Sequence, residues 1–241
     1  MAGRFLALEG GDGVGKTTLA RMVADLDYEQ GLKAAGEDPP TGRLVYVSRR
    51  QMSATSAYSA GLMGHLSTML WGSGDSPDLP DSFWVPLQAA WFTAHSTTVI
   101  GPLLDSGLDV IVDGWVYKFF SKLILQGYDQ AVLDATFSRV RMPDAVILLT
   151  ADPAALYDRR EGQFRPAELG MHAALPDLGK ETFITYQTDG QRLLRETAVR
   201  RGWPTLLVDA DEQAPETAAR LSPIVAELRH HDTLTYGGSR R

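Results

Sequence analysis

The sequence contains no cysteine, which excludes a disulfide framework, a thiolate metal site and a cysteine nucleophile, and permits a reducing compartment such as the cytoplasm. It also lacks an apolar run of membrane-spanning length and the layout of a signal peptide, so we expect a soluble protein with no membrane partner. Positive charge is scarce. With 23 Lys and Arg residues against 30 Asp and Glu residues, the net charge of −7 argues against general nucleic-acid binding, although a local basic pocket is compatible with it.

What the sequence does contain is typical of one α/β domain. Its 241 residues, 44% of them apolar, suffice for one full core but not for two ordinary domains. Short apolar segments predict strands at 4–9, 44–47, 109–113, 145–149 and 206–208. Helical patterns lie at 16–33, 54–70, 81–105, 153–160, 180–201 and 215–228. This alternation predicts a five-stranded parallel sheet with helices on both faces, in one domain over residues 1–228 followed by a flexible tail over 229–241.

A phosphate-binding motif lies between the first strand and the first helix. Gly10-Gly11-Asp12-Gly13-Val14-Gly15-Lys16-Thr17 matches G-x-x-x-x-G-K-[ST] in full, and its context favours a phosphate loop over a glycine-rich turn with a chance lysine. Glycines let backbone N–H groups approach a polyphosphate, while Lys16 would neutralise its charge and the Thr17 hydroxyl would bind Mg²⁺. The motif therefore predicts a three-layer P-loop NTPase fold that binds ATP and Mg²⁺ through Gly10, Gly11, Asp12, Gly13, Val14, Gly15, Lys16, Thr17 and Thr18.

Two further features fit phosphoryl transfer. Asp113 ends the third strand, where a carboxylate would organise Mg²⁺ or the acceptor, although a strand-end Asp can also cap a turn. The segment 158–179 is rich in helix breakers and is interpreted as a lid that brings Arg159, Arg160 or Arg165 to the transferring phosphate. The alternative is a solvated helix end whose arginines favour the helix dipole. The candidate catalytic residues are Lys16, Asp113, Arg159 and Arg165.

The sequence resembles the thymidylate kinase family of nucleoside monophosphate kinases. The segment from Phe5 to Thr18 is very similar to the family's opening segment, and Val47-Ser48-Arg49 to the end of its second strand. Residues 99–113 and 142–153 follow the layout of the family's later strands more loosely. The resemblance implies transfer of the γ-phosphoryl group of ATP to a nucleoside monophosphate with Mg²⁺, in a homodimer packed through helices.

The resemblance also implies which segment supplies positive charge to the transferring phosphate. In the family, the cation that clamps the transferring phosphate lies in the phosphate loop or in the lid. This loop carries Gly13 and Val14 at its variable positions, so the lid must supply the cation, and Asp12 would face the acceptor.

The acceptor side departs from the family pattern. The family's Asp-Arg pair is Asp113-Gly114 here, and its serine five residues past that aspartate is Lys118. Its base-stacking Phe and base-reading Arg align with Gln88 and Phe92. Basic side chains still offer phosphate binding, although Arg50 and Lys118 would equally suit simple surface charge. The candidate acceptor-binding residues are Asp12, Arg49, Arg50, Gln88, Trp91, Phe92 and Lys118.

Several alternatives remain open. Trp84, Trp91 and Phe92 can share one broad helix face, either in the core or as a platform for a flat acceptor. A phosphate acceptor, as in dTMP or a related nucleotide, needs no general base, whereas a hydroxyl acceptor on another small molecule would make Asp12 or Asp113 the base. A nucleotide-binding regulatory protein without turnover is a third hypothesis. The histidines form no ligand pattern, so no metal beyond nucleotide-bound Mg²⁺ is expected.

Overall fold

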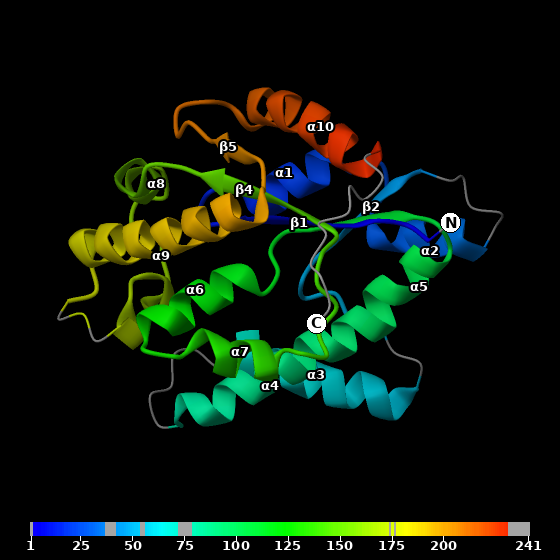
Figure 1. Cartoon of the computed structure of the whole chain (residues 1–241), viewed down its shortest axis with the longest axis horizontal. Coiled ribbons are helices and arrows are strands. Elements are labelled where there is room, and N and C mark those ends of the chain that lie inside the picture. The colour runs from blue at the N-terminus through cyan, green and yellow to red at the C-terminus, as the bar shows by residue number, and fades with distance from the viewer. Residues whose placement is uncertain are drawn as a thin grey trace, which may run out of the picture.

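The computed structural model describes residues 2–36, 42–53, 56–71, 79–173, 175 and 177–230. At its centre lie five parallel strands, β1 (Phe5–Gly10), β2 (Leu44–Val47), β3 (Asp109–Val112), β4 (Ala145–Thr150) and β5 (Thr205–Leu207). Their order in the sheet is β2-β3-β1-β4-β5 (Figure 1). In the register, Leu6 of β1 lies beside Ile111 on one side and Ala145 on the other. The predicted five-stranded parallel sheet is confirmed, with each strand end within one residue of its expected place.

Helices surround the sheet. They are α1 (Lys16–Val23), α2 (Tyr28–Gly36), α3 (Ala57–Trp71), α4 (Asp81–His95), α5 (Gly101–Asp105), α6 (Tyr117–Leu125), α7 (Gln130–Thr136), α8 (Pro153–Arg159), α9 (Lys180–Arg201) and α10 (Ala214–His230). A π-helical turn, η1 (Ser96–Ile100), joins α4 to α5, and two short 3₁₀ turns are η2 (Pro166–Glu168) and η3 (Met171–Ala173). Within the described ranges, none of these helices is both long and apolar enough to cross a lipid bilayer.

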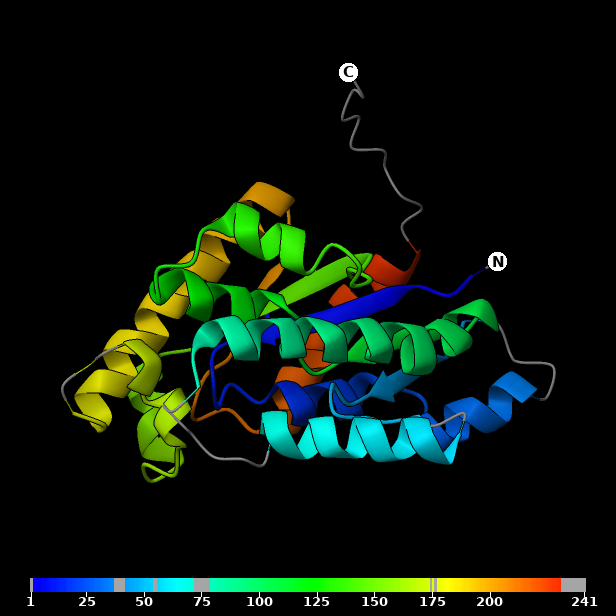
Figure 2. The same ribbon diagram turned by 90° about the horizontal axis from the view of Figure 1, so that it is seen from below.

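The strands are buried on both faces because alternate side chains enter two different cores. In β1, Phe5 and Ala7 lie in one core, and Leu6 and Leu8 lie in the other. The first core packs α2, α4, α5, α6 and α7 against the sheet, and the second packs α1, α8 and α10 (Figures 1 and 2). A strand covered on both sides has no solvent face, which explains the continuous apolar runs of the sequence. The expected three-layer architecture is therefore confirmed.

The helix predicted over residues 16–33 is in fact two helices. Between α1 and α2 the N–H groups of Asp25 and Leu26 both donate to the carbonyl oxygen of Leu44, at 2.9 and 3.1 Å. Leu26 thereby pairs with the edge of the sheet beside Val45. A locally helical pattern thus yields to backbone pairing with a distant strand. The helix predicted over 81–105 runs on through Pro86 and is interrupted only by η1.

The sequence patterns did not predict α6 and α7. The start of α7 carries a local signal, because the side chain of Asp129 accepts a hydrogen bond from the N–H of Ala131 at 2.7 Å and caps the helix.

The predicted tail also begins too early. Arg229 belongs to α10, and its Nε lies 2.7 Å from a carboxylate oxygen of Asp109, which ties the helix end to β3. Residues 231–241 lie outside the described residues.

Candidate active site

The phosphate loop turns sharply between β1 and α1. Gly10, Gly13 and Gly15 have φ angles of 150°, 81° and 97°, a region that residues with side chains rarely adopt. A Cβ atom on Gly10 would lie 2.4 Å from the carbonyl oxygen of Leu149, so only glycine fits there. The loop ends at the N-terminus of α1, where free N–H groups and the helix dipole favour an anion. This geometry suits a polyphosphate.

Lys16 lies across the loop instead of extending into solvent. Its Nζ donates to the carbonyl oxygens of Gly10 at 2.9 Å and Gly11 at 2.6 Å. Burial, and then the nearby cation Lys118, lowers the pKa of Lys16 to about 7. A bound phosphate would raise this pKa again, because an adjacent anion stabilises the protonated amine.

Asp113 and Thr17 come together at the carboxyl end of the sheet. The Thr17 hydroxyl donates to Asp113 Oδ2 at 2.6 Å, and the backbone N–H of Arg49 donates to Asp113 Oδ1 at 3.1 Å. Tyr46 donates its hydroxyl to the same carboxylate at 3.1 Å. Burial alone would raise the pKa of Asp113, but the hydrogen bonds from Thr17 and Arg49 outweigh it and lower the pKa. The carboxylate therefore stays ionised beside the loop.

This pair of oxygen atoms fits the predicted Mg²⁺. Carboxylate and hydroxyl oxygens are the hard ligands that Mg²⁺ prefers, and Mg²⁺ commonly binds through one or two such groups together with substrate phosphates. The described residues contain no cluster of three or more His, Cys, Asp and Glu side chains that would hold a metal unaided. The donor set thus suits a metal that arrives with a nucleotide.

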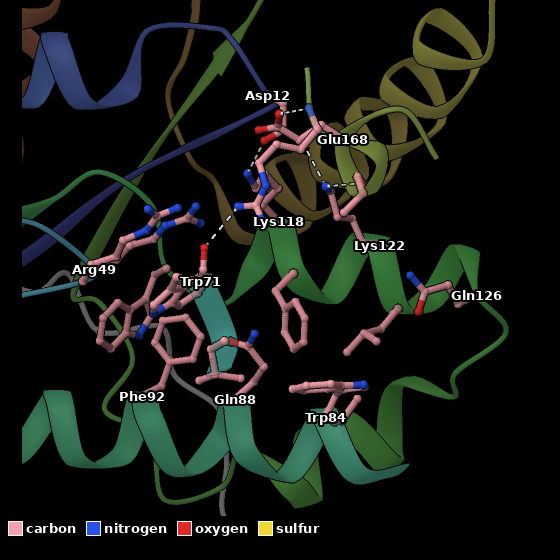
Figure 3. Close-up of a pocket in the computed structure, with 18 of the residues that line it drawn as sticks. Asp12, Arg49, Trp71, Trp84, Gln88, Phe92, Lys118, Lys122, Gln126 and Glu168 are labelled. Atoms are coloured by element: carbon pink, nitrogen blue, oxygen red, sulfur yellow. Dashed lines mark hydrogen bonds and ion pairs between the residues drawn. The ribbon is translucent and has the colours of Figure 1, made fainter. Parts of the chain in front are cut away.

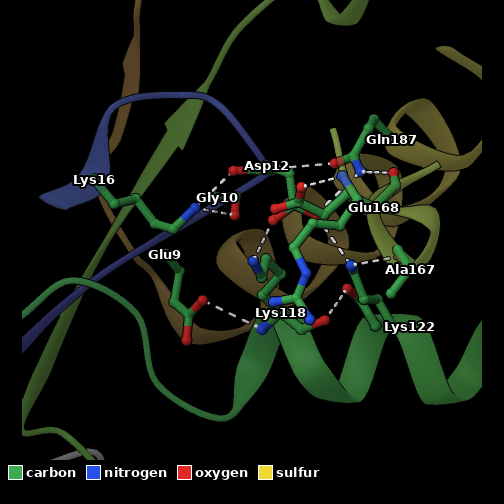
Figure 4. A network of polar contacts seen from close by, with 12 residues as sticks. Glu9, Gly10, Asp12, Lys16, Lys118, Lys122, Ala167, Glu168 and Gln187 are labelled. Atoms are coloured by element: carbon green, nitrogen blue, oxygen red, sulfur yellow. Dashed lines mark hydrogen bonds and ion pairs between the residues drawn. The ribbon is translucent and has the colours of Figure 1, made fainter. Parts of the chain in front are cut away.

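Asp12 is the centre of a polar network that joins the phosphate loop to α6 and α9 (Figure 4). Its carboxylate pairs with Lys118 Nζ at 2.6 Å and Lys122 Nζ at 3.0 Å, and accepts from Gln187 Nε2 at 3.1 Å. Gln187 in turn donates to the carbonyl oxygen of Glu168, which ties the predicted lid to the same network. Burial would raise the pKa of Asp12, but the two lysines hold it well below its usual value.

Glu9 is a buried carboxylate that the sequence analysis did not single out. It accepts hydrogen bonds from the backbone N–H groups of Trp115, Tyr117 and Lys118, at 2.9, 3.1 and 3.2 Å. Burial raises the pKa of Glu9, and the Trp115 N–H opposes that shift. Glu9 therefore caps the start of α6 from β1 and positions Lys118. The sequence did contain a signal for this role, because Glu9 is an acidic residue within a segment predicted to be a buried strand. A buried carboxylate needs hydrogen-bond or ionic partners.

A cavity of about 230 Å³ opens beside the Asp12 network (Figure 3). It lies between α4, α6, the end of α3 and η2. All but one of the predicted acceptor-binding residues line it, namely Asp12, Arg49, Arg50, Gln88, Phe92 and Lys118. The fold thus gathers side chains from four separate segments around one cavity, with its charged side next to the phosphate loop.

Trp91 is the exception, and its assignment to the cavity is wrong. Its side chain is fully buried, its indole N–H donates to the carbonyl oxygen of Arg49 at 3.0 Å, and its ring packs edge-on against Trp71. The side chain of Trp91 lies on the core side of α4, whereas that of Phe92, about 100° further around the helix, reaches the cavity. Trp91 is a core residue that supports the backbone of Arg49. Phe92 lines the cavity and also packs on Trp115 in the core.

Several lining residues escaped the sequence analysis. They are Trp71, Phe119, Lys122, Gln126, Glu168 and Tyr186. Trp71 lies beneath the guanidinium groups of Arg49 and Arg50, at 5.1 and 5.2 Å from its ring centre. Lys122 follows Lys118 by four residues, a spacing that places both on one helix face, but α6 itself was not predicted. Trp84, which the sequence left open between core and platform, lines the cavity.

The three arginines of the predicted lid have different surroundings. Arg159 Nη2 donates to the carbonyl oxygen of Gly13 in the phosphate loop at 2.6 Å. Arg165 lines the cavity. Arg160 stacks its guanidinium on the ring of Phe164, at 4.4 Å from the ring centre. Arg159 thus lies on the loop side and Arg165 on the cavity side.

Comparisons with known proteins agree with this architecture. No protein-family model matches the sequence. The chain is 28% identical over 166 residues to the thymidylate kinase of Caldicellulosiruptor saccharolyticus, covering 66% of this chain and 70% of that protein. It is 27% identical to the thymidylate kinase of Clavibacter sepedonicus, covering 89% and 94%. The crystal structure of thymidylate kinase from Ehrlichia chaffeensis superimposes with a TM-score of 0.57 at 14% identity, over 93% of this chain, which supports the fold.

Parallel strands around a glycine loop, with a cavity lined by basic and aromatic side chains beside that loop, are the architecture of a P-loop nucleotide kinase, a class of phosphotransferase. The sequence relatives narrow this class. The chain is similar in sequence and fold to thymidylate kinases, in agreement with the resemblance to that family.

Proposed function

We propose that the protein transfers the γ-phosphoryl group of ATP to the phosphate of a nucleoside monophosphate, with dTMP as the primary acceptor. The observation that carries the proposal is the cavity beside the phosphate loop, joined to it by the ion pair between Asp12 and Lys118. Cations on the loop side suit a phosphate, and aromatic side chains on the far side suit a planar base. The relatives named thymidylate kinase support the same reaction.

A phosphate acceptor fits this site better than a hydroxyl acceptor. Transfer to a hydroxyl requires a general base, for which Asp12 and Asp113 are the candidates. The pKa of Asp12 lies well below its usual value, and that of Asp113 is also lowered, so both carboxylates are weak bases. A phosphate oxygen is already anionic, and positioning with charge neutralisation then carries the catalysis.

On the donor side, we assign the loop from Gly10 to Thr18 to the triphosphate, which its N–H groups would bind. Lys16 would neutralise the transferring group. Thr17 and Asp113, with oxygens 2.6 Å apart, would hold Mg²⁺, which when bound neutralises charge on the phosphates. Arg159 would add positive charge from the lid side of the loop.

On the acceptor side, we assign Arg49, Arg50 and Lys118 to the acceptor phosphate. Gly114 stands where the family pattern has an arginine, and a Cβ atom there would lie 3.9 Å from Nη1 of Arg49. The guanidinium of Arg49 therefore occupies the space beside Gly114, and we infer that it replaces the missing arginine. Trp84 and Phe92 would contact the base.

Activity on dTMP, compared with thymidine, tests the proposed function. We expect ADP release with dTMP, and a kcat/KM at least about a hundredfold lower with thymidine, because thymidine lacks the phosphate that Arg49, Arg50 and Lys118 would bind. The measurement is a coupled assay of ADP release. Faster turnover of thymidine, or of another alcohol, would instead support a hydroxyl acceptor. ATP binding without transfer to any nucleoside monophosphate would support a regulatory nucleotide-binding protein.

Substitutions of the two lid arginines, Arg159 and Arg165, should affect different kinetic parameters. Replacing Arg159 with alanine is expected to lower kcat by about a hundredfold, because this guanidinium lies at the phosphate loop. Replacing Arg165 should mainly raise the KM for dTMP, by about tenfold, because Arg165 lines the acceptor cavity. Steady-state kinetics with both substrates varied would measure the split. Arg192→Ala, at an exposed position on α9 whose arginine pairs with Glu196, is the matched control. Equal effects of R159A and R165A on both parameters would contradict this division.

A homodimer and a cytoplasmic location complete the proposal. The family resemblance implies a dimer packed through helices. In support, α3 has no buried residue and exposes Tyr58 and Leu62, at 80% and 55%, one helical turn apart. The absence of cysteine and the use of ATP fit the cytoplasm.

A further inference from the structure

The far side of the cavity carries an unsatisfied polar atom. Gln88 lies between Trp84 and Phe92 on one face of α4, at a spacing of four residues, and all three point toward α6 (Figure 3). Its Oε1 is buried and has no hydrogen-bond partner within the described part of the chain. Buried acceptors are normally paired, because an unpaired one costs free energy. The unpaired oxygen therefore points to a ligand that supplies an N–H group.

The surroundings of Gln88 indicate a flat, uncharged ring. Its neighbours on α4 are aromatic, and Phe119 and Leu123 line the cavity from α6. None of the charged lining residues lies on α4. Lys118 and Lys122 lie on α6, and the others belong to the phosphate loop, to the segment after β2 and to the predicted lid. In Figure 3, Gln88 and Trp84 lie across the cavity from Asp12 and Lys118. An acceptor with a phosphate at one end and a neutral base at the other matches this division.

We propose that Gln88 is the specificity-determining residue of the acceptor site and reads the base through its amide. This inference rests on the proposed function. It assigns to the site a wider substrate class than dTMP alone: pyrimidine monophosphates with a 4-amino group as well as those with a 4-oxo group.

The chemistry of an amide supports both kinds of base. A 4-oxo pyrimidine presents a carbonyl acceptor beside the N3–H donor, and a 4-amino pyrimidine presents an amino donor beside the N3 acceptor. The side-chain amide offers one acceptor and one donor. Because rotation by about 180° about its last bond exchanges them, Gln88 can match either edge. A lone cation or carboxylate would match only one of the two polar groups on either edge.

The sharpest test uses two acceptors that differ only at this edge, dTMP and 5-methyl-dCMP. We expect the wild-type protein to use both, with kcat/KM values within about tenfold of each other, since a mismatched pair usually costs more than that. If dTMP is turned over but the two kcat/KM values differ by more than about tenfold, the inference is overturned and the proposed function stands. Failure of every nucleoside monophosphate overturns the proposed function, and the inference with it.

Two variants test the residue itself. Gln88→Glu offers acceptors only. A carboxylate can accept from the peripheral amino group of 5-methyl-dCMP, whereas the N3–H of dTMP is flanked by two carbonyl oxygens that repel it, so the ratio of kcat/KM for 5-methyl-dCMP to that for dTMP should rise by about tenfold. Gln88→Met keeps the length but no hydrogen bond, so the KM values for both acceptors should rise while their ratio stays near that of the wild type. The ratio compares two substrates in one preparation, and partial misfolding does not move it. Gln130→Glu, at an exposed position on α7, is the matched control. An unchanged ratio in Q88E overturns the assignment of Gln88.

Discussion

Replacing Lys16 with alanine is expected to lower kcat for phosphoryl transfer by about a thousandfold. Lys16 is the cation of the phosphate loop, and its Nζ lies within 2.9 Å of two loop carbonyl oxygens. In the proposed transition state, charge would spread over the oxygens of the moving group, and we expect this amine to neutralise it. Triphosphate affinity should fall as well, because the buried amine is stabilised as a cation only beside an anion.

The matched control is Lys33→Ala. Lys33 lies on α2 and is exposed to solvent, so its removal subtracts the same charge from the protein without touching the loop. The measurements are steady-state kinetics with ATP and dTMP, and ATP binding by calorimetry. If K16A binds ATP and turns over as the wild type does, the phosphate-loop interpretation of residues 10–17 is wrong.

Replacing Asp12 with alanine is expected to lower the free energy of unfolding by about 3 kcal/mol. Its side chain is 7% exposed and pairs with Lys118 and Lys122, whose side chains are 12% and 19% exposed. Removing the carboxylate leaves two largely buried ammonium groups without a counter-ion near Lys16. Urea denaturation of the wild type and of D12A at pH 7 measures the difference.

The acid dependence of this effect has a defined sign. The pKa of Asp12 is lowered by folding, so its stabilisation is present above the unfolded value of about 3.8 and is lost as the pH falls below it. The difference between wild type and D12A should therefore shrink below about pH 4. Asp158→Ala is the matched control, because the Asp158–Lys180 pair is solvent-exposed and should leave stability nearly unchanged. Equal stability losses in D12A and D158A would contradict the role of the buried pair.

The sequence alone was sufficient for the sheet and the phosphate loop. Continuous apolar runs such as residues 145–149 indicate strands buried on both faces, because a strand without a solvent face has no position that favours a polar side chain. The glycine loop could also be predicted from the sequence. The positive φ angle at Gly10 is a local requirement, and glycine is the residue type that meets it without strain. The resemblance to one kinase family rested on these same local segments, and the comparisons confirmed it.

The acceptor side was predicted only in part. Arg49, Gln88 and Phe92 were named as candidates, and they do line one cavity. Trp91 was named with them and lies in the core, because the rotation of a helix about its own axis depends on what packs against it. Composition cannot distinguish the two faces when both carry aromatic residues.

What the sequence by itself determined is therefore what neighbouring residues decide together: strand positions, the glycine turn, and the Lys16-Thr17 pair that follows it. The tertiary structure decided which side chains from distant parts of the sequence come into contact. Asp12 meets Lys118 across 106 positions of the chain, and Glu9 caps a helix that begins more than a hundred residues later. Such contacts arise because parallel strands bring their carboxyl ends to one edge, and buried charges must then find counter-ions or hydrogen bonds there. That requirement acts on the assembled fold, and no local pattern records it.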